Sequence, residues 1–175
     1  GTFVFPTGTK RIRGRVISKN TNEAAGSYRL QDESGAGIYF YSVIGSPVYP
    51  LDAVLEINPN DGGKFTLYNG DLELMSVPQA NVTQVSGAIT ITPRVATIAD
   101  IITNRNTWAS SLVKINNVTG ISVASSNGTG TTYNVTDASG TLSMFVRTTS
   151  GITVNTSGTS ITGYVSIYNT TTQIG

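Results

Sequence analysis

The sequence contains neither cysteine nor histidine in its 175 residues. A zinc site built from Cys and His is therefore excluded, and so are acid–base catalysis by histidine and any catalytic triad that contains either residue. Disulfides are excluded as well, so the packed core alone must stabilise the fold. We expect no catalytic residue, no cofactor and no metal, and we interpret the chain as a protein that is not an enzyme.

Charged residues are also scarce. They make up 12% of the chain, and the net charge is +1. A protein that coats DNA gains affinity from many Lys and Arg contacts to phosphates, so this composition argues against such a role. No run of about eighteen apolar residues is present, so we expect no membrane-spanning helix. The abundant Thr, Ser, Asn and Gly are typical of strands and turns in secreted and surface β-proteins.

One pattern occurs twice along the chain. YRLQDESGAGIYFY begins at Tyr28 and YNVTDASGTLSMFV begins at Tyr133, and each reads as a strand, Asp-x-Ser-Gly, and a second strand. The alternating segment RIRGRVIS precedes the first copy, and SLVKINNVTGI precedes the second. A further hairpin follows each copy, TLYNGDLEL at Thr66 and SIYNTTTQI at Ser166. Four matching segments in the same order predict a duplicated domain.

Each copy contains a long first strand, a hairpin, a connection and another hairpin. Five strands are too few for an immunoglobulin-type sandwich and suit a small OB-type barrel. We therefore predict an all-β fold of two tandem five-stranded OB-fold-like barrels with a short connecting helix. Residues 1–93 would form the first domain, and residues 94–175 the linker helix and second domain. The predicted core of the first barrel contains Ile12, Val16, Leu30, Ile38 and Phe40.

The segment between the copies is PRVATIADIITNRNTWASS. Thr97 can cap a short helix whose apolar positions include Ile98, Ile101 and Ile102. Such a helix would bridge the units or plug the end of a barrel. An extended linker is the alternative.

Several of these segments together resemble a known family: RGRVIS, YRLQDESGAGI, TLYNGDLEL, VATIADI, LVKINNV and YNVTDASG. From Lys10 onward the chain looks like the paired OB-fold-like domains of unknown function in surface and secreted proteins of Bacteroidetes. The shared motifs are strand and turn patterns, so the resemblance implies a fold and no activity. It also implies an extracellular or bacterial cell-surface location, as in a surface lipoprotein, and the missing cysteines fit this setting.

Asp32 and Asp137 occupy equivalent positions beside Ser-Gly and invite a catalytic or calcium-binding interpretation. The simpler interpretation is that each accepts hydrogen bonds from backbone N–H groups of the turn that follows, where Gly tolerates positive φ. A calcium loop needs several oxygen ligands at set spacing, and DESGAG supplies too few.

Two other acidic segments could in principle supply a pair of catalytic carboxylates. Asp61-Gly62-Gly63 does not supply such a pair. Asp71 and Glu73 lie on one face of a predicted strand, at a spacing that a glycosidase could use. The second copy has Thr171 and Gln173 there, so we interpret the acidic pair as a solvated strand face.

Alternation sends a basic and aromatic set to the outer face of the first barrel. The candidate binding residues are Arg13, Arg15, Arg29, Gln31, Tyr39 and Tyr41. OB-folds bind oligonucleotides and oligosaccharides on this face, where Arg donates hydrogen bonds and Tyr stacks on bases or sugar rings. The second copy does not keep this set, since its equivalents include Lys114, Asn116, Asn134, Thr136, Phe145 and Arg147.

Two interpretations of this face remain open. In the first, the chain is a binding module that contacts a polysaccharide, a single-stranded nucleic acid or a protein through this face, or through the loops at residues 20–27 and 58–63. In the second, the chain is a structural or assembly domain, and the face packs against the second unit or a neighbouring domain. Exposed rings at Tyr39 and Tyr41 would favour binding, and buried rings would favour assembly.

Overall fold

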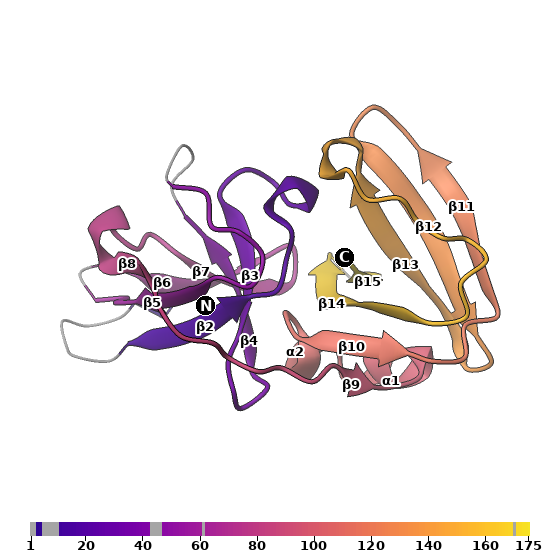
Figure 1. Ribbon diagram of the computed structural model, residues 1–175, viewed down its shortest axis with the longest axis horizontal. Helices are drawn as coiled ribbons and strands as arrows, with labels where there is room; N and C mark the ends of the chain where they lie inside the picture. Colours follow the sequence, from indigo (N-terminus) through magenta and orange to yellow (C-terminus); the bar gives the residue numbers. More distant parts are fainter. Residues whose placement is uncertain (1–2, 5–10, 43–46, 61, 170) are drawn as a thin grey trace.

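The computed structural model describes residues 3–4, 11–42, 47–60, 62–169 and 171–175. Nearly all of its regular structure is β-strand, and the strands form two units that lie side by side (Figure 1). The predicted all-β class is confirmed. Within the described ranges, no helix is long and apolar enough to cross a membrane.

The first unit is an eight-stranded sheet in the order β1-β6-β7-β4-β3-β2-β5-β8. Its neighbouring strands are antiparallel except β4 and β7, which are parallel. The strands are β1 (Phe3–Val4), β2 (Ile12–Val16), β3 (Ser27–Gln31), β4 (Gly37–Tyr41), β5 (Val54–Ile57), β6 (Lys64–Tyr68), β7 (Asp71–Met75) and β8 (Val82–Val85). Two short 3-10 helices, η1 (Asn20–Asn22) and η2 (Gln79–Asn81), lie in its connections.

The second unit is a seven-stranded sheet in the order β11-β12-β13-β15-β14-β10-β9. Its strands are β9 (Arg94–Val95), β10 (Leu112–Ile115), β11 (Gly120–Ser126), β12 (Gly130–Asp137), β13 (Gly140–Arg147), β14 (Ile161–Tyr168) and β15 (Thr171–Ile174), with the 3-10 helix η3 (Thr148–Ser150) after β13. The predicted domain boundary at residues 93–94 falls between β8 and β9.

The strand order repeats between the units. The first sheet contains β1-β6-β7-β4-β3-β2, and the second contains β10-β14-β15-β13-β12-β11 in matching places. The parallel pair has the same register in both, with Phe40 opposite Leu74 and Met144 opposite Ile174. The duplication inferred from four short segments is therefore present in the hydrogen-bonded pairing.

Two features differ from the predicted five-stranded barrels. The first unit adds β5 and β8 beside β2, and among the described residues neither sheet is closed by hydrogen bonds. In the second unit the chain leaves the sheet at residues 116–119, so β10 pairs with β14 while β11 pairs with β12. The predicted long first strand is thus divided: β11 forms one edge of the sheet, and β10 lies near the other, beside the edge strand β9.

Alternation explains both cores. In the first unit Val16, Leu30 and Phe40 are fully buried, and Ile12 and Ile38 pack against them from partly buried positions, as predicted. In the second unit, every second residue of β13 belongs to the core: Leu142, Met144 and Val146 are all buried. The residues between them point away from the core.

The predicted helix is confirmed as α1 (Ile98–Thr103), followed by the single turn α2 (Arg105–Trp108). Thr97 caps α1 as predicted, and Asp100 completes a capping box with it. Ile98 and Ile101 are buried in the core of the second unit, so the helix packs on that unit. Ile102 is 40% exposed and does not belong to the apolar face, because it follows Ile101 on the helix and points away from it.

Candidate functional site

Three of the six predicted binding residues lie between the units. Arg29, Gln31 and Tyr39 are 5%, 4% and 7% exposed. Alternation does place them outside the first core, but the second unit covers them. The Oε1 atom of Gln31 accepts a hydrogen bond from the N–H of Leu112 at 3.0 Å, and Nη1 of Arg29 donates to Oγ of Ser110 at 3.1 Å. The prediction of an accessible face is corrected here, because the pattern of one strand cannot show what covers its outer side.

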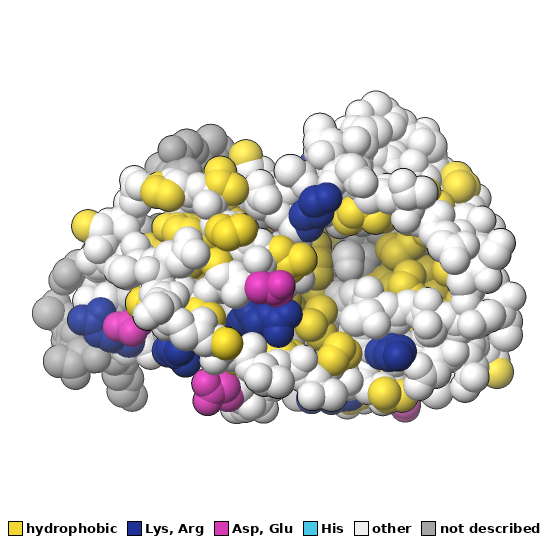
Figure 2. All heavy atoms as spheres, viewed as in Figure 1, with side chains coloured by type: hydrophobic (Ala, Val, Ile, Leu, Met, Phe, Trp, Pro, Cys, Tyr) yellow, Lys and Arg dark blue, Asp and Glu magenta, His cyan; other side chains and the backbone are white. Residues whose placement is uncertain are grey.

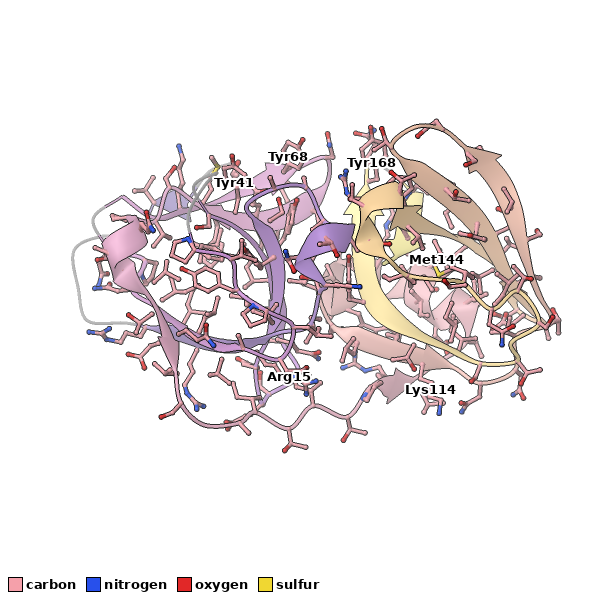
Figure 3. All side chains as sticks on the ribbon, turned by 45° about the horizontal axis from the view of Figure 1, so that its top comes forward. Arg15, Tyr41, Tyr68, Lys114, Met144 and Tyr168 are labelled. Carbon is pink, nitrogen blue, oxygen red and sulfur yellow. The ribbon has the colours of Figure 1, made fainter. Side chains whose placement is uncertain are left out.

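The other three predicted residues are not gathered into one surface. Arg15 pairs with Asp52 at 2.6 Å, and Arg13 pairs with Glu33 at 3.3 Å. Tyr41 is half-buried at the cavity described below. Figure 3 shows Arg15 and Tyr41 on opposite sides of the first unit in that view. The six residues therefore do not form the flat aromatic and basic surface that the sequence suggested.

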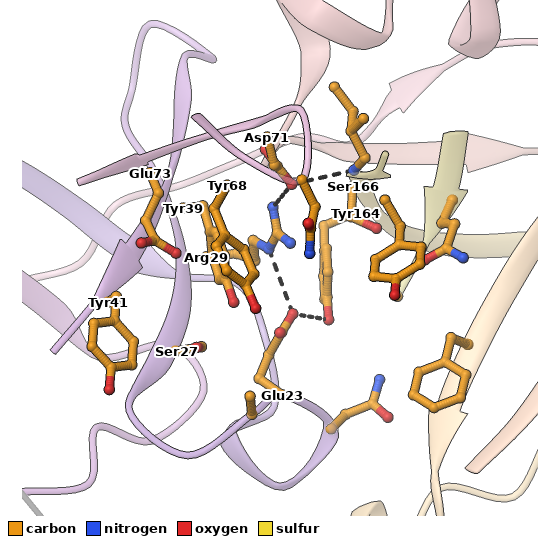
Figure 4. Close-up of a pocket in the computed structure, with 18 of the residues that line it drawn as sticks. Glu23, Ser27, Arg29, Tyr39, Tyr41, Tyr68, Asp71, Glu73, Tyr164 and Ser166 are labelled. Carbon is orange, nitrogen blue, oxygen red and sulfur yellow. Dashed lines mark hydrogen bonds and ion pairs between the residues drawn. The ribbon is translucent and has the colours of Figure 1, made fainter. Parts of the chain in front are cut away.

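A cavity of about 950 Å³ lies between the two units. Strands β3, β4, β6 and β7 line it from the first unit, and β12 to β15 line it from the second (Figure 4). The loop at residues 20–27, which was the predicted alternative binding segment, also contributes to the wall, whereas the described part of residues 58–63 does not. The aromatic side chains of the wall are Tyr39, Tyr41, Tyr68, Phe145, Tyr164 and Tyr168.

The two units face the cavity with equivalent positions. Tyr68 pairs with Asp71 in the first hairpin, and Tyr168 pairs with Thr171 in the second. In the same registers Glu73 corresponds to Gln173, and all these residues except Thr171 line the cavity. On the side of the molecule shown in Figure 3, Tyr68 and Tyr168 lie on either side of the gap between the units. The shared tyrosine of the two matching hairpins is the signal in the sequence by which this part of the cavity could have been predicted.

A buried ion cluster fastens the units together. The guanidinium of Arg29 contacts carboxylate oxygens of Asp71 and of Glu23, the latter at 3.5 Å, and lies 3.9 Å from the ring centre of Tyr39. From the second unit, the hydroxyl of Tyr164 donates to Glu23, and the N–H of Ile167 donates to Asp71 at 3.2 Å. Each carboxylate thus joins Arg29 to the opposite unit.

The cluster perturbs the ionisation of its members. Burial by itself lowers the pKa of Arg29, but the neighbouring carboxylates of Glu23 and Asp71 outweigh it and raise that pKa above its ordinary value. Burial, followed by the charge of Glu23, raises the pKa of Tyr164 well above its ordinary value. Arg29 therefore stays charged and Tyr164 stays neutral at physiological pH. This maintains the ion pairs of Arg29 and the hydrogen bond from Tyr164 to Glu23.

Asp71 and Glu73 are not the solvated strand face that the sequence suggested, since they are 1% and 6% exposed. The second unit covers this side of β7, as it covers Arg29. Asp71 is paired with Arg29, but Glu73 makes no hydrogen bond or ion pair with any described residue. Burial raises the pKa of Glu73 above the ordinary carboxyl value, and the charge of Arg29 offsets this in part.

Gly37 allows the close approach of the units. A Cβ atom at this position would lie 1.9 Å from the carbonyl oxygen of Ser110, so no other residue fits without moving backbone. The first residue of β4 is thereby held against the chain that leads into β10.

Both twin turns have the predicted hydrogen bonds to Asp, but of the two turn glycines only Gly35 has a positive φ, at 88°. Oδ1 of Asp32 accepts from the N–H of Ser34 at 2.9 Å, and Oδ1 of Asp137 accepts from the N–H of Ser139 at 2.8 Å. Asp137 differs in also accepting from the N–H of Ile98 at the start of α1, at 3.0 Å. In the part of the chain that is described, no group of three or more acidic residues is arranged to hold a metal ion. Asp61, the other acidic residue considered from sequence, lies outside the described residues.

No family model and no curated protein matches the chain. Among solved structures, the chain is similar to a murine DNA-binding protein bound with double-stranded DNA, at 13% identity and a TM-score of 0.38, over 95% of this chain and 93% of that one. It is also similar to a HINb domain, at 12% identity and a TM-score of 0.40, over 99% and 93%. A third similar structure is a HINa domain in complex with double-stranded DNA. The identity is 11% and the TM-score is 0.37, over 94% of this chain and 90% of that one. At these scores the likenesses support nothing about the ligands of this chain.

Proposed function

We propose that the chain is a non-catalytic binding module whose ligand is a stretch of polysaccharide held in the cavity between the units. The observation that carries this proposal is the convergence of aromatic side chains from both units on one cavity. Of the six residues predicted to bind, Arg29, Tyr39 and Tyr41 line this cavity, and Arg13, Arg15 and Gln31 do not.

We also propose that each unit is a partly open OB-type barrel. The shared strand order, with one parallel pair inside an otherwise antiparallel set, supports this assignment. The cavity then lies against the face built from the second and third barrel strands, β3 and β4 in one unit and β12 and β13 in the other. OB-folds use this face for ligands.

The exposed rings provide stacking surfaces for sugars. Tyr68 and Tyr168 are each 56% exposed at the cavity wall. A tyrosine presents a flat apolar face with a polar tip, which matches the apolar face and hydroxyl rim of a pyranose. Two such rings from different units would contact different residues of one chain-like ligand.

The remaining polar lining suits a neutral ligand. Thr66, Asn69, Ser166 and Gln173 place hydroxyl and amide groups along the wall. Such groups both donate and accept hydrogen bonds, as sugar hydroxyls do. In Figure 2, Lys, Arg, Asp and Glu side chains cover only small parts of the face that is in view.

Charge argues against a nucleic acid in this cavity. Its basic lining residues are Arg29 and Arg147, and Arg29 is already paired with Asp71 and Glu23. Glu73 adds a further negative charge. Phosphate backbones need an excess of Lys and Arg, which the cavity lacks.

A structural role is the second candidate function. The burial of Arg29, Gln31 and Tyr39 between the units favours it, because these residues serve interdomain docking. An extracellular or bacterial cell-surface location stays a prediction from composition and resemblance.

A binding screen at two salt concentrations separates these functions. We expect neutral glycans on an array to bind the protein, with little change between low and high salt. Binding of single-stranded oligonucleotides that weakens steeply with salt would contradict the polysaccharide proposal. Binding of neither class would leave the structural role.

A further inference from the structure

One carboxylate in the cavity has no hydrogen-bond or ion-pair partner among the residues that the structure describes. Glu73 lies on β7, is 6% exposed and lines the cavity. Its cross-strand neighbours are Thr66 on β6 and Tyr39 on β4. Neither forms a hydrogen bond or an ion pair with it, and no other described residue does so. Figure 4 shows its carboxylate beside Tyr39 and Tyr41, with no dashed line reaching it.

The nearest cation does not neutralise Glu73. Arg29 contacts Asp71, Glu23 and Ser110, so its donors are directed to those groups. The carboxylate oxygens of Glu73 are not among the fully buried side-chain atoms that lack a partner, so they can be reached from the cavity. Its acceptor oxygens are therefore available to a hydrogen-bond donor in the cavity, which can be water or a ligand.

The hairpin itself does not require this charge. Gln173 occupies the equivalent position of the second unit, in the same register and on the wall of the same cavity. A neutral side chain of the same length thus fits the same strand pairing. The difference between the two positions is chemical rather than structural.

Resting on the function proposed above, we propose that Glu73 is the hydroxyl-binding group of the cavity and accepts hydrogen bonds from two adjacent hydroxyls of one sugar ring. An ionised carboxylate has two acceptor oxygens and no donor, which matches a pair of neighbouring hydroxyl donors. Tyr68 is a diagonal neighbour of Glu73 on the same face of the hairpin, within reach for an aromatic side chain. The ring that binds Glu73 can therefore also stack on Tyr68.

This arrangement specifies a class of sugar. The ring at Glu73 must carry two free neighbouring hydroxyls. A ring bearing a carboxylate or sulfate at that place would be repelled by Glu73. The carboxylate of Asp71, which is close to Glu73, carries the same sign of charge and would add to this repulsion. The ligand is thus a neutral polysaccharide rather than an acidic one.

The test is Glu73→Gln, which gives the first unit the residue of the second. The probes are cellohexaose, mannohexaose and xylohexaose, measured by titration calorimetry against wild type, Glu73→Gln and the exposed control Glu33→Gln. We expect Glu73→Gln to weaken binding of the best hexasaccharide about tenfold, the scale of one charge-assisted hydrogen bond. The control should bind as wild type does, because Glu33 pairs with Arg13 outside the cavity.

A pH series gives a second readout. Glu73 is faced by Arg29, Asp71, Tyr39 and, through Arg29, by Glu23. Wild-type affinity should fall as the pH is lowered and the Glu73 carboxylate takes up a proton, and this fall should be smaller in Glu73→Gln. If Glu73→Gln does not fold, Glu73→Asp serves instead, since it keeps the charge and should keep the pH dependence with weaker binding.

The outcomes separate the two proposals. Unchanged affinity of Glu73→Gln, in a protein whose binding is lost on Tyr168→Ala, would overturn the role of Glu73 and leave the cavity function intact. Equal affinity for hexasaccharides and for hexauronic acids would also overturn it. Failure of wild type to bind any of the three hexasaccharides would overturn both proposals.

Discussion

Tyr68 and Tyr168 occupy the same position in two copies of one hairpin, and both are 56% exposed on the wall of the cavity between the units. The hairpins themselves meet, since a Cβ atom at Gly70 would lie 2.6 Å from the carbonyl oxygen of Asn169. The hairpin of the first unit is thus in contact with the equivalent hairpin of the second unit. The cavity consequently presents one tyrosine from each half of the chain.

The paired tyrosines predict paired losses in binding. We expect Tyr68→Ala and Tyr168→Ala each to weaken glycan binding by about 1–3 kcal/mol, by analogy with one stacked ring. The measurement is titration of wild type and each variant with the hexasaccharide that binds best. Val123→Ala is a matched control, because Val123 is 58% exposed but does not line the cavity. A loss confined to one tyrosine would show that the ligand contacts only one unit.

The buried Arg29 should be important for stability. Arg29→Ala leaves Asp71 and Glu23 buried without their cation, so we expect the free energy of unfolding to fall by about 3–5 kcal/mol. Urea denaturation measures this change. Arg13→Ala is the comparison, because Arg13 and Glu33 form an exposed pair at 3.3 Å that should contribute at most about 1 kcal/mol. Equal effects of the two substitutions would refute the role of Arg29 in joining the units.

The twin turns should differ in their contribution to stability and in its pH dependence. Asp137→Ala loses bonds to both the turn and α1, so we expect a loss of about 2–3 kcal/mol, against about 1 kcal/mol for Asp32→Ala. Burial alone raises the pKa of Asp137, but hydrogen bonds from Ser139 and from the N–H of Ile98 outweigh it and lower that pKa below the ordinary value.

The sign of the Asp137 effect follows from that lowered pKa. Its stabilising contribution is fully present above the pKa of an unfolded aspartate and is lost as the pH falls through the folded value. The difference in unfolding free energy between wild type and Asp137→Ala should therefore be largest near neutral pH and shrink in acid. A difference that grows in acid would contradict the assigned hydrogen bonds. Thermal unfolding at a series of pH values measures it.

The approach of Gly37 to Ser110 predicts an intolerant position. Gly37→Ala would place a Cβ atom 1.9 Å from a backbone carbonyl oxygen, so the units must separate locally and stability must fall. Gly120→Ala is the control, because a Cβ atom there would have no neighbour within 4 Å. Thermal unfolding of both variants measures the difference. Similar melting temperatures would contradict the close contact between the units.

Much of the fold could be predicted from local patterns. Alternation in RIRGRVIS and in YRLQDESGAGIYFY identified the strands and the core residues Val16, Leu30 and Phe40, because side chains of a strand alternate between its two faces. Thr97 identified the start of α1, because a helix begins where a side chain satisfies its free N–H groups. The twin Asp-x-Ser-Gly turns were predicted for the same kind of local reason.

The candidate site could not be predicted in this way. Alternation showed that Arg29, Gln31, Tyr39 and Glu73 point out of the first core, but an outward direction does not distinguish solvent from a neighbouring unit. That distinction depends on how the two copies dock, through contacts such as that between Arg29 and Ser110, which are 81 residues apart in sequence.

The β-strands, the helix, the turns and the duplication could therefore be predicted from the order of the residues, because each depends on residues that are close along the chain. Three features depend on how the units dock and could not be read locally. Tyr68 and Tyr168 share a cavity, the ion pairs of Arg29 are hydrogen-bonded to the second unit, and Glu73 is buried with no hydrogen-bond or ion-pair partner among the described residues. Burial and pairing of charges arise from contacts between segments that are distant in sequence. Such contacts are set by the packing of one unit against the other.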